Sequence, residues 1–465
     1  MSYGRGVPAN EKPMLAIQYS LPLRDFNISG LFYGRSSFGE VLFLFYKQAV
    51  DYILNIEKFG SSYGLETVSA LLQRLGNPQN NLKFVHIAGT NGKGSTSCFI
   101  TNILIESGYK TGTFNSPSVF GYNERYLIDG KPVDDDSIAK YITIVAEERA
   151  KMQQEGLTLP TAFELEFAVA MLIFNDKHCD IAVLECGLGG RLDATNVIPD
   201  KLAAVITSIS FDHTAILGNT LKEIATEKYA IVKECPLITF NQCDEVMQVF
   251  EKAHDLRLTR PVKLIESSKD GQTFVYDGAK YHIKQLGGYQ LQNCSLAIEC
   301  ASVLKEKGLN ITSDSIKRGI ENSYWKGRLQ KIRKNGKTFI LDGTHNPDGA
   351  KVLADELKLN FSDMTKCFVF GMFKDKDMDG VLSHIGPLAD CFITITPSSE
   401  RGQDNKITLS RCLEYTKNSC CADDMQSAIC TAYNKDYPLI IVCGSLSILS
   451  SALQAINDIP DEVNI

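Results

Sequence analysis

The segment that decides the fold reads Ala88-Gly89-Thr90-Asn91-Gly92-Lys93-Gly94-Ser95-Thr96. It follows the β-branched run at 84–87 and precedes an apolar pattern that predicts a helix over 97–107. Glycines let the backbone turn so that its N–H groups face a phosphate chain, and the start of a helix adds partial positive charge. Lys93 supplies a point charge for the outer phosphates, and the Ser95 hydroxyl can reach a Mg²⁺ ion. The segment therefore predicts a nucleotide-binding loop.

The glycine spacing of this loop departs from the usual G-x-x-x-x-G-K-[ST] pattern, because Gly94 stands between Lys93 and Ser95. A glycine-rich turn without a ligand is the alternative interpretation, and the predicted strand and helix on either side disfavour it. No N-K-x-D sequence of the kind that reads guanine follows the loop. The sequence therefore also disfavours a GTP switch.

Short β-branched runs alternate with helical periodicity on both sides of the loop. This alternation predicts an α/β fold with two domains and a cleft between them. Residues 46–322 would form a P-loop-type nucleotide-binding domain with a mostly parallel sheet, and residues 323–465 a C-terminal Rossmann-like domain. The expected strands of the two sheets are 84–87, 110–113, 181–184, 204–208, 338–341, 367–370, 392–395 and 439–442. The stretch at 262–283 predicts antiparallel strands with a turn at Asp277-Gly278.

Residues 1–45 are rich in Gly, Ser and Pro and show no sustained period. Their apolar run at 41–45 comes too late in the chain for a secretory signal peptide. We expect an extension that is poorly ordered, and an appended docking arm is the alternative.

The composition limits the partners of this protein. Its 465 residues carry 48 Lys and Arg against 55 Asp and Glu, a formal net charge of −7. This balance gives no electrostatic case for binding nucleic acid, and no apolar run reaches the roughly 18 residues that a membrane-spanning helix needs. The 14 cysteines include no C-x-x-C pair, which favours reduced, structural thiols in a cytoplasmic protein. We expect small-molecule partners, without nucleic acid or membrane.

Two polar residues follow predicted strands of the first sheet. Glu185 ends the run at 181–184 and should lie at the carboxyl edge of the sheet, where open α/β sheets bind ligands. A carboxylate on a buried strand is costly unless it is paired or bound to a metal, so Glu185 is a candidate metal ligand, with a structural ion pair as the alternative. His213 follows the run at 204–208 and is a second candidate, although nitrogen is a less usual Mg²⁺ ligand than oxygen.

The loop sequence G-T-N-G-K-G-S resembles the nucleotide loop of folylpolyglutamate synthases and dihydrofolate synthases, which are members of the Mur ligase superfamily. The resemblance extends from Tyr46 to about Ser450. Its further matches are Gly64-Leu65-Glu66, Leu75-Gly76-Asn77-Pro78, Glu185–Asn196, Asp212-His213-Thr214, Leu217-Gly218, Glu227-Lys228, Gly327-Arg328-Leu329 and Asp342–Pro347.

This resemblance implies an ATP- and Mg²⁺-dependent ligase that adds L-glutamate to the γ-carboxylate of a reduced folate through an acyl phosphate. Dihydropteroate is a second implied acceptor, and relatives suggest a monomer. A peptidoglycan-precursor Mur ligase is the nearest alternative. Such enzymes usually lack the glycine found at position 94 and the Leu-Gly-Asn-Pro motif found at 75–78. A regulatory module that hydrolyses ATP without ligation is a rival from a different class.

The resemblance also assigns residues to sites. Its nucleotide site would consist of Gly89, Thr90, Asn91, Gly92, Lys93, Gly94, Ser95, Thr96, Asn293, Arg328, Asp342 and His345. The metal ligands would be Ser95, Ser116, Glu185 and His213, and the substrate contacts would be Phe163, Asp193 and Ser445. The catalytic residues would be Lys93, His213 and Lys228.

Two of these positions carry a further implication. The lysine that matches Lys228 is typically carbamylated by CO₂ in this superfamily, and only a deprotonated amine with a lowered pKa reacts in that way. Many relatives have His where this chain has Ser118, whereas Asp193 matches relatives that accept both pteroate and folate substrates. These two features point in opposite directions, so the use of dihydropteroate stays open.

Overall fold

The computed structural model of the protein describes residues 44–56 and 64–461. From Leu44 onward the chain is one compact unit. All but the last two residues of the expected extension at 1–45 lie outside the described residues, and those two lead directly into α1 (Tyr46–Leu54).

An eight-stranded sheet forms the first half of this unit, with the strand order β4-β3-β2-β5-β1-β6-β7-β8. The six strands from β2 to β8 are parallel to their neighbours, and β3 and β4 extend one edge in antiparallel fashion. The strands are β1 (Lys83–Ala88), β2 (Thr111–Phe114), β3 (Tyr126–Ile128), β4 (Lys131–Pro132), β5 (Ile181–Glu185), β6 (Lys201–Ile206), β7 (Leu237–Thr239) and β8 (Leu256–Leu258). The expected mostly parallel sheet is confirmed.

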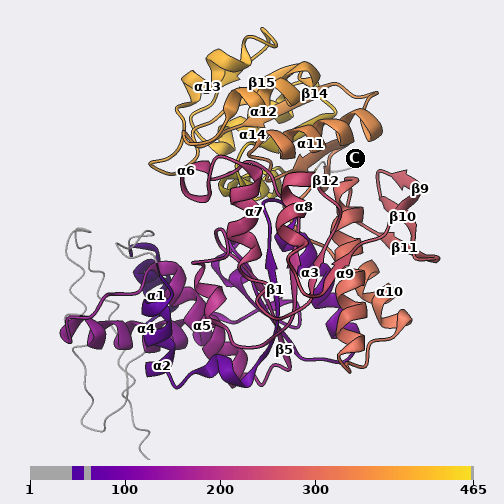
Figure 1. Ribbon diagram of the computed structural model, residues 1–465. Helices are drawn as coiled ribbons and strands as arrows, with labels where there is room; N and C mark the ends of the chain where they lie inside the picture. Colours follow the sequence, from indigo (N-terminus) through magenta and orange to yellow (C-terminus); the bar gives the residue numbers. More distant parts are fainter. Residues whose placement is uncertain (1–43, 57–63, 462–465) are drawn as a thin grey trace, which may run out of the picture. The chain divides into compact units, whose positions relative to one another are not determined.

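Helices cover both faces of this sheet because its central strands are apolar on both sides. In β6, Ala203 and Val205 face one core, whereas Ala204 and Ile206 face the other. The first core receives α3 (Lys93–Glu106), α9 (Tyr289–Glu306) and α10 (Ser313–Asn322), and the second receives α7 (Leu221–Tyr229) and α8 (Asp244–Phe250). Another group of helices packs together near α5 (Figure 1), namely α1, α2 (Glu66–Arg74), α4 (Asp135–Gln154) and α5 (Ala162–Asp176).

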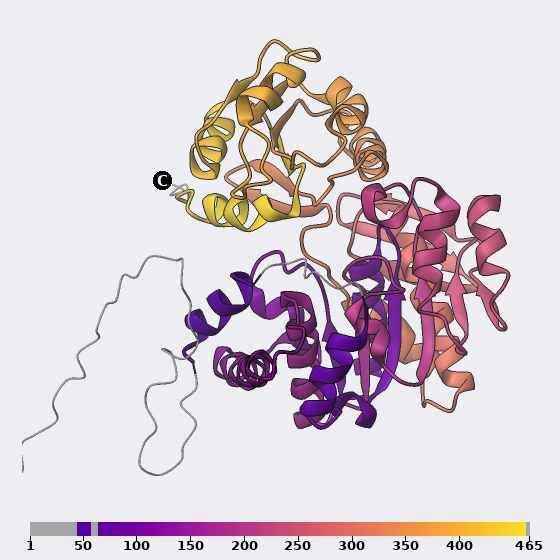
Figure 2. The same cartoon turned by 60° about the vertical axis from the view of Figure 1, so that its left-hand side comes forward.

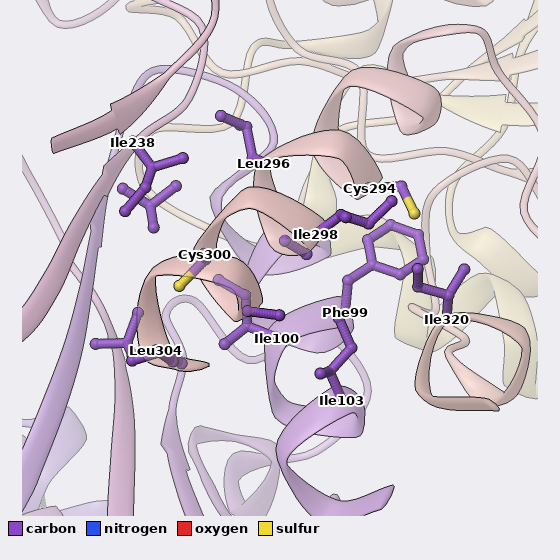
Figure 3. Close-up of a cluster of buried hydrophobic side chains, with 14 of the residues drawn as sticks. Phe99, Ile100, Ile103, Ile238, Cys294, Leu296, Ile298, Cys300, Leu304 and Ile320 are labelled. Atoms are coloured by element: carbon purple, nitrogen blue, oxygen red, sulfur yellow. The ribbon is translucent and has the colours of Figure 1, made fainter. Parts of the chain in front are cut away.

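The helix that follows the glycine-rich loop is held by the first of these cores (Figure 3). In this view Phe99 of α3 lies beside Cys294 of α9 and Ile320 of α10, and all three side chains are fully buried. The expected start of this helix at residue 97 is wrong. The helix begins at Lys93, because Gly92 adopts φ 93° and turns the chain directly from the loop into the first helical turn.

A small antiparallel sheet follows in the chain, as predicted for residues 262–283. It consists of β9 (Lys263–Ser268), β10 (Gly271–Tyr276) and β11 (Ala279–Ile283). Asp277 and Gly278 both have positive φ and form the two-residue connection of the β10–β11 hairpin.

The second half of the unit is built on a six-stranded sheet with the order β12-β13-β17-β14-β15-β16. Its strands are β12 (Gln330–Lys334), β13 (Lys337–Leu341), β14 (Lys366–Phe370), β15 (Cys391–Thr394), β16 (Cys420–Cys421) and β17 (Leu439–Cys443). All pairs are parallel except β12 with β13. The sequence did not predict β12, because its polar residues lack the apolar run of a central strand.

Helices flank both faces of the second sheet (Figure 2). One face carries α11 (Pro347–Asn360) and α12 (Met378–Ile385), and the other carries α14 (Met425–Asn434) and α15 (Leu449–Asn457). The expected α/β class with a second Rossmann-like half is confirmed. The change of sheet falls between the end of α10 and the start of β12, close to the expected boundary.

Two predictions from composition can be compared with the described residues. All 14 cysteines lie in the described part of the chain, and all are free thiols, as expected. Among the residues that the structure describes, no helix combines the length and apolar character needed to cross a bilayer.

Leu104→Ala should destabilise the protein, because this fully buried side chain of α3 packs in the core behind the loop. The free energy of unfolding, measured by urea denaturation, should fall by about 2–5 kcal/mol. Leu359→Ala is the matched control, since this leucine of α11 is 64% exposed, and it should change the free energy by less than about 0.5 kcal/mol. Equal losses for the two variants would contradict the assigned core.

Candidate functional site

Three strand ends meet at one edge of the first sheet. β1 lies between β5 and β6, and the chain passes from β5 on one side to β6 on the other. Residues 89–92 follow β1, Glu185 ends β5, and residues 207–213 follow β6. The carboxyl edge at such a switch point is where open α/β sheets bind ligands, so the predicted loop and both candidate metal ligands lie at the expected edge.

Close approach of neighbouring groups requires glycine at three positions of the loop. A Cβ atom added at Gly89 would lie 1.7 Å from Thr207 Oγ1, and one at Gly92 would lie 2.4 Å from Asn293 Oδ1. At Gly94 a Cβ atom would lie 2.9 Å from Cζ2 of Trp325. The glycine that departs from the usual loop pattern therefore makes room for an indole ring.

The side chains of the loop are held by local hydrogen bonds. Lys93 Nζ donates to the carbonyl oxygens of Gly89 and Thr90, each at 3.2 Å. The buried Ser95 Oγ accepts from Gln290 Nε2 at 3.2 Å. Thr96 Oγ1 is also buried and has no hydrogen-bond partner within the described residues. The amine and hydroxyls of the loop thus lie together at the start of α3.

Lys228, on α7, contacts the same loop with its side chain. Its side chain is buried, and its Nζ donates to the Gly89 carbonyl at 2.9 Å. Burial, together with the nearby charge of Lys93, lowers the pKa of Lys228 to about 7. A substantial fraction of this amine is therefore uncharged near neutral pH.

Glu185 is buried at the end of β5, and burial raises its pKa to about 7 against the opposing charges of Lys93 and Arg328. The backbone N–H of Ser116 also stabilises the carboxylate. The Ser116 hydroxyl is buried without a hydrogen-bond partner in the part of the chain that the structure describes. A carboxylate beside an unpaired hydroxyl offers the oxygen ligands that Mg²⁺ prefers. No group of three or more His, Cys, Asp or Glu residues suited to a metal occurs among residues 44–56 and 64–461.

Asp212 contacts a lysine and a histidine next to His213. Its carboxylate lies 2.6 Å from Lys376 Nζ and 3.6 Å from His345 Nε2, both from the second half. Burial alone would raise the pKa of Asp212, but hydrogen bonds with His345 and Lys376 hold it well below the usual value. His213 itself has φ 51°, and burial lowers its pKa although Asp212 opposes that change.

A cavity of about 350 Å³ lies between the loop and the second half. Asn346 of the second half donates from Nδ2 to Asn91 Oδ1 at 3.2 Å beside it. The sequence-predicted nucleotide residues that line this cavity are Asn91, Gly92, Ser95, Asn293, Arg328, Asp342 and His345. Residues from both halves of the protein therefore line this one cavity. Beside it in the loop lie Gly89, Thr90, Lys93, Gly94 and Thr96.

Asp342 shapes this cavity with hydrogen bonds of its own. Its Oδ2 accepts from the backbone N–H of Leu329 at 2.8 Å, and its Oδ1 accepts from the backbone N–H and hydroxyl of Thr344 at 2.9 and 2.5 Å. These contacts place Arg328, whose Nη1 donates to the Gly327 carbonyl at 3.3 Å. The carboxylate thus fixes the segment that presents the guanidinium.

A second cavity, of about 870 Å³, is lined by His213 and by Gly187, which follows Glu185 by two residues. Four sequence-predicted residues line it, namely Ser116, Phe163, Asp193 and His213. Its wall combines apolar side chains such as Leu188 with the cationic Lys374, Lys376 and Arg401. Ser445 lines neither of these two described cavities, and its hydroxyl instead accepts from the Ser447 backbone N–H at 3.3 Å.

Sequence reasoning missed several residues that position the site. Trp325 lies just past the predicted boundary between the two domains and carries no local signal of a site, although it is the single tryptophan of the chain and its ring lies against Gly94. Asn346 belongs to the matched segment Asp342–Pro347 but was not predicted as a site residue. Its side chain caps α11 by accepting from Gly349 N–H at 2.9 Å. Gln290 and Lys376 carry no local signal, because their partners are far away in the sequence.

Comparisons with known proteins identify two domains in this chain. Residues 87–301 match the Mur ligase middle domain, and residues 327–446 match the Mur ligase glutamate ligase domain. The chain is 34% identical over 364 residues to a dihydrofolate synthase/folylpolyglutamate synthase of Bacillus subtilis, a match that covers 75% of this chain and 84% of that protein. It is 30% identical over 431 residues to the folylpolyglutamate synthase of Lacticaseibacillus casei, covering 88% of this chain and 98% of that protein.

Solved structures are similar across the same region. A Mycobacterium tuberculosis folylpolyglutamate synthase, complexed with ADP and AMPPCP, has a TM-score of 0.78 at 28% identity and covers 90% of this chain and 99% of its own. Escherichia coli FolC in complex with DHPP and ADP has a TM-score of 0.76 at 27% identity and covers 89% and 97%. Both similarities span the two halves described above.

Asp212→Asn should lower the free energy of unfolding at pH 7 by about 3 kcal/mol, because it leaves the largely buried Lys376 without its counter-ion. The folded-state pKa of Asp212 is depressed, so its contribution is complete above the unfolded-state pKa of about 3.9 and is lost as the pH falls through the folded value. Urea denaturation from pH 7 to pH 3 should therefore show the difference from wild type shrinking below about pH 4.

Asp375→Asn is the matched control for this ion pair. Asp375 pairs with Arg401 at 2.7 Å, but both side chains are about half exposed, so the loss should stay below about 1 kcal/mol. A loss for Asp212→Asn no larger than that of the control would refute the structural role of the Asp212 contacts.

Proposed function

Because this chain belongs to the folylpolyglutamate synthase/dihydrofolate synthase family of the Mur ligase superfamily, we propose that it uses ATP to join L-glutamate to the γ-carboxylate of a reduced folate. The observation that carries this proposal is the cavity lined by both halves of the protein, with loop residues such as Ser95 on one side and Arg328 on the other. Relatives of known structure have been solved with ADP, AMPPCP and DHPP.

The reaction needs an activated carboxylate. The carboxylate of the acceptor attacks the γ-phosphorus of ATP, the bond to the β-phosphate breaks, and ADP leaves. The amine of glutamate then attacks the acyl carbon of the acyl phosphate, loses a proton, and releases inorganic phosphate as the amide forms. Negative oxygens meet in both steps, so cations aimed at the phosphates stabilise them more in the transition state than in the ground state.

The loop and the facing arginine supply those cations. In this proposal the backbone N–H groups of residues 89–95 bind the phosphates, and Lys93 exchanges its two loop carbonyls for the outer phosphate oxygens. Arg328 approaches the same phosphates from the second half, and a guanidinium suits bidentate contact with them. His345 and Asn293 would contact the rest of the nucleotide in the same cavity.

Mg²⁺ would be held by Ser95, Ser116, Glu185 and His213. The fit is supported by the unpaired buried hydroxyl of Ser116 and by the buried carboxylate of Glu185. When bound, the ion would neutralise part of the negative charge on the phosphates.

The second cavity would take the folate acceptor. Phe163 and Leu188 offer an apolar wall for a flat ring, and Asp193 offers a carboxylate. Dihydropteroate is a second proposed acceptor, because Ser116 and Pro117 line this cavity whereas Ser118, the position that departs from many relatives, does not. A module that only hydrolyses ATP would not need an acceptor cavity of this size beside its metal ligands.

Lys93→Ala should abolish glutamate transfer, because the phosphates lose the only lysine at the start of α3. The assay offers ATP, Mg²⁺ and glutamate with tetrahydrofolate, dihydropteroate or a UDP-muramoyl acceptor, and resolves products by mass. Wild type should add glutamate to tetrahydrofolate, and Lys93→Ala should be at least about 10²-fold slower. Lys83→Ala, at an exposed position of β1, should retain full activity. Near-normal turnover by Lys93→Ala would refute the loop assignment, and transfer to the muramoyl acceptor alone would refute the acceptor class.

We also propose that Lys228 is carbamylated. Its pKa of about 7 makes the neutral amine that reacts with CO₂ available, and that fraction rises from pH 6 to pH 8. Enzyme prepared without CO₂ should therefore regain activity on adding bicarbonate, faster at pH 8 than at pH 6. Carbon-13 bicarbonate should give a carbamate NMR signal that Lys228→Met lacks and that Lys222→Met, at an exposed position of the same helix, retains. A signal unchanged by Lys228→Met would exclude this modification.

A further inference from the structure

Three buried side chains form a hydrogen-bonded relay between β1 and the second cavity. His86 Nε2 lies 2.7 Å from Thr195 Oγ1, and Thr195 Oγ1 lies 2.5 Å from Asp193 Oδ1. His86 and Thr195 are fully buried, and Asp193 is nearly so. Asp193 is the member that lines the cavity. The relay thus runs from the interior of the sheet to the wall of the proposed acceptor site.

The donors and acceptors that each of the three groups offers fix the direction of the hydrogen bonds along this relay. Burial keeps the pKa of His86 well below its usual value, with help from the charges of Lys201 and Lys233, so its imidazole is neutral. Burial raises the pKa of Asp193, but hydrogen bonds from Thr195 and from the Leu188 backbone oppose this shift by stabilising the carboxylate, which can only accept. The single hydroxyl proton of Thr195 therefore goes to Asp193 Oδ1. The Thr195 oxygen then accepts from His86, which places the proton of the imidazole on Nε2. Such a relay orders all three groups, because each donation strengthens the next.

The carboxylate of Asp193 is fixed on both of its oxygens. Oδ1 also accepts from the Thr195 backbone N–H at 3.0 Å, and Oδ2 accepts from the Leu188 backbone N–H at 2.9 Å. These bonds tie the loop between β5 and β6 to the wall of the second cavity. His86 supports this arrangement from β1, three residues before Gly89 of the nucleotide loop.

A purely structural role would not require a histidine at this place. His86 Nδ1 is buried without a hydrogen-bond partner among the described residues. Leaving a buried polar atom unpaired costs free energy, whereas an apolar side chain on β1 would carry no such cost. The neighbouring thiol of Cys186 lies 3.1 Å from Nε2, and burial raises its pKa, so it stays protonated and adds no charge.

We infer that His86 is a positioning residue that acts through Thr195 to orient the Asp193 carboxylate toward the folate acceptor. This inference rests on the proposed function, because it takes the second cavity to be the acceptor site. It goes further in assigning a role to two residues that do not touch the acceptor. Disturbing the relay should weaken use of the acceptor and leave use of ATP nearly unchanged, although β1 leads directly into the ATP loop.

The test compares Thr195→Val, which removes the hydroxyl, with Thr195→Ser, which keeps it. Steady-state kinetics with tetrahydrofolate should show the KM of the acceptor raised about tenfold in Thr195→Val, with the KM of ATP unchanged within about twofold and Thr195→Ser close to wild type. His86→Leu should shift the acceptor KM in the same direction, and His86→Gln, whose amide can still donate, should shift it less. The double variant Thr195→Val/His86→Leu should be no worse than Thr195→Val, because His86 acts through the hydroxyl.

Thr113→Val is the matched control. Thr113 belongs to β2 of the same sheet, is buried, and shares a hydrogen bond with Thr101 at 2.8 Å away from both cavities. It should lower stability without raising the acceptor KM. The inference is overturned if Thr195→Val and Thr113→Val change the acceptor KM equally, or if ATP and acceptor KM rise together. If wild type transfers no glutamate, the proposed function fails, and calorimetric titration of tetrahydrofolate then tests the relay alone, with equal affinity for Thr195→Val and wild type contradicting it.

Discussion

Two lysine side chains donate to one carbonyl oxygen, that of Gly89, and the chemistry of the site depends on this shared contact. Lys93 approaches it from α3 at 3.2 Å and Lys228 from α7 at 2.9 Å. Their proximity adds to burial in lowering the pKa of Lys228. The same proximity leaves positive charge at the end of β1 that an anionic ligand would neutralise. The turn at Gly92 makes this contact possible, because it starts α3 at Lys93, directly after the loop.

The second half of the protein completes the site through specific contacts rather than through shape alone. Lys376 and His345 both reach Asp212, and Asn346 reaches Asn91 of the loop. These contacts join segments that follow β1 and β6 to the segments that precede α11 and α12. A nucleotide in the cavity beside them would therefore meet charged and polar groups from both sheets, which is what a reaction between two anions and an amine requires.

The parts of the fold that could be predicted from the sequence are those that produce a pattern among neighbouring residues. Buried parallel strands have short apolar runs in the sequence, so β1, β5 and β14 could be predicted, whereas the polar edge strand β12 could not. The loop, Glu185 and His213 could be placed at one sheet edge because they directly follow strands. The partners of Asp212 and Ser95 could not, since those contacts join residues more than 130 positions apart along the chain. His86 could be read only as a strand residue, because its partner Thr195 comes from a distant turn.

A crystal structure of the protein with AMPPCP, Mg²⁺ and tetrahydrofolate would show whether the loop binds the phosphates. We expect Lys93 Nζ to leave the carbonyl oxygens of Gly89 and Thr90 and to contact the outer phosphate. We also expect an ion next to Glu185, and Arg328 within hydrogen-bond distance of the phosphate chain. Phosphates bound elsewhere, with Lys93 still donating to its own loop, would refute the proposed role of the loop.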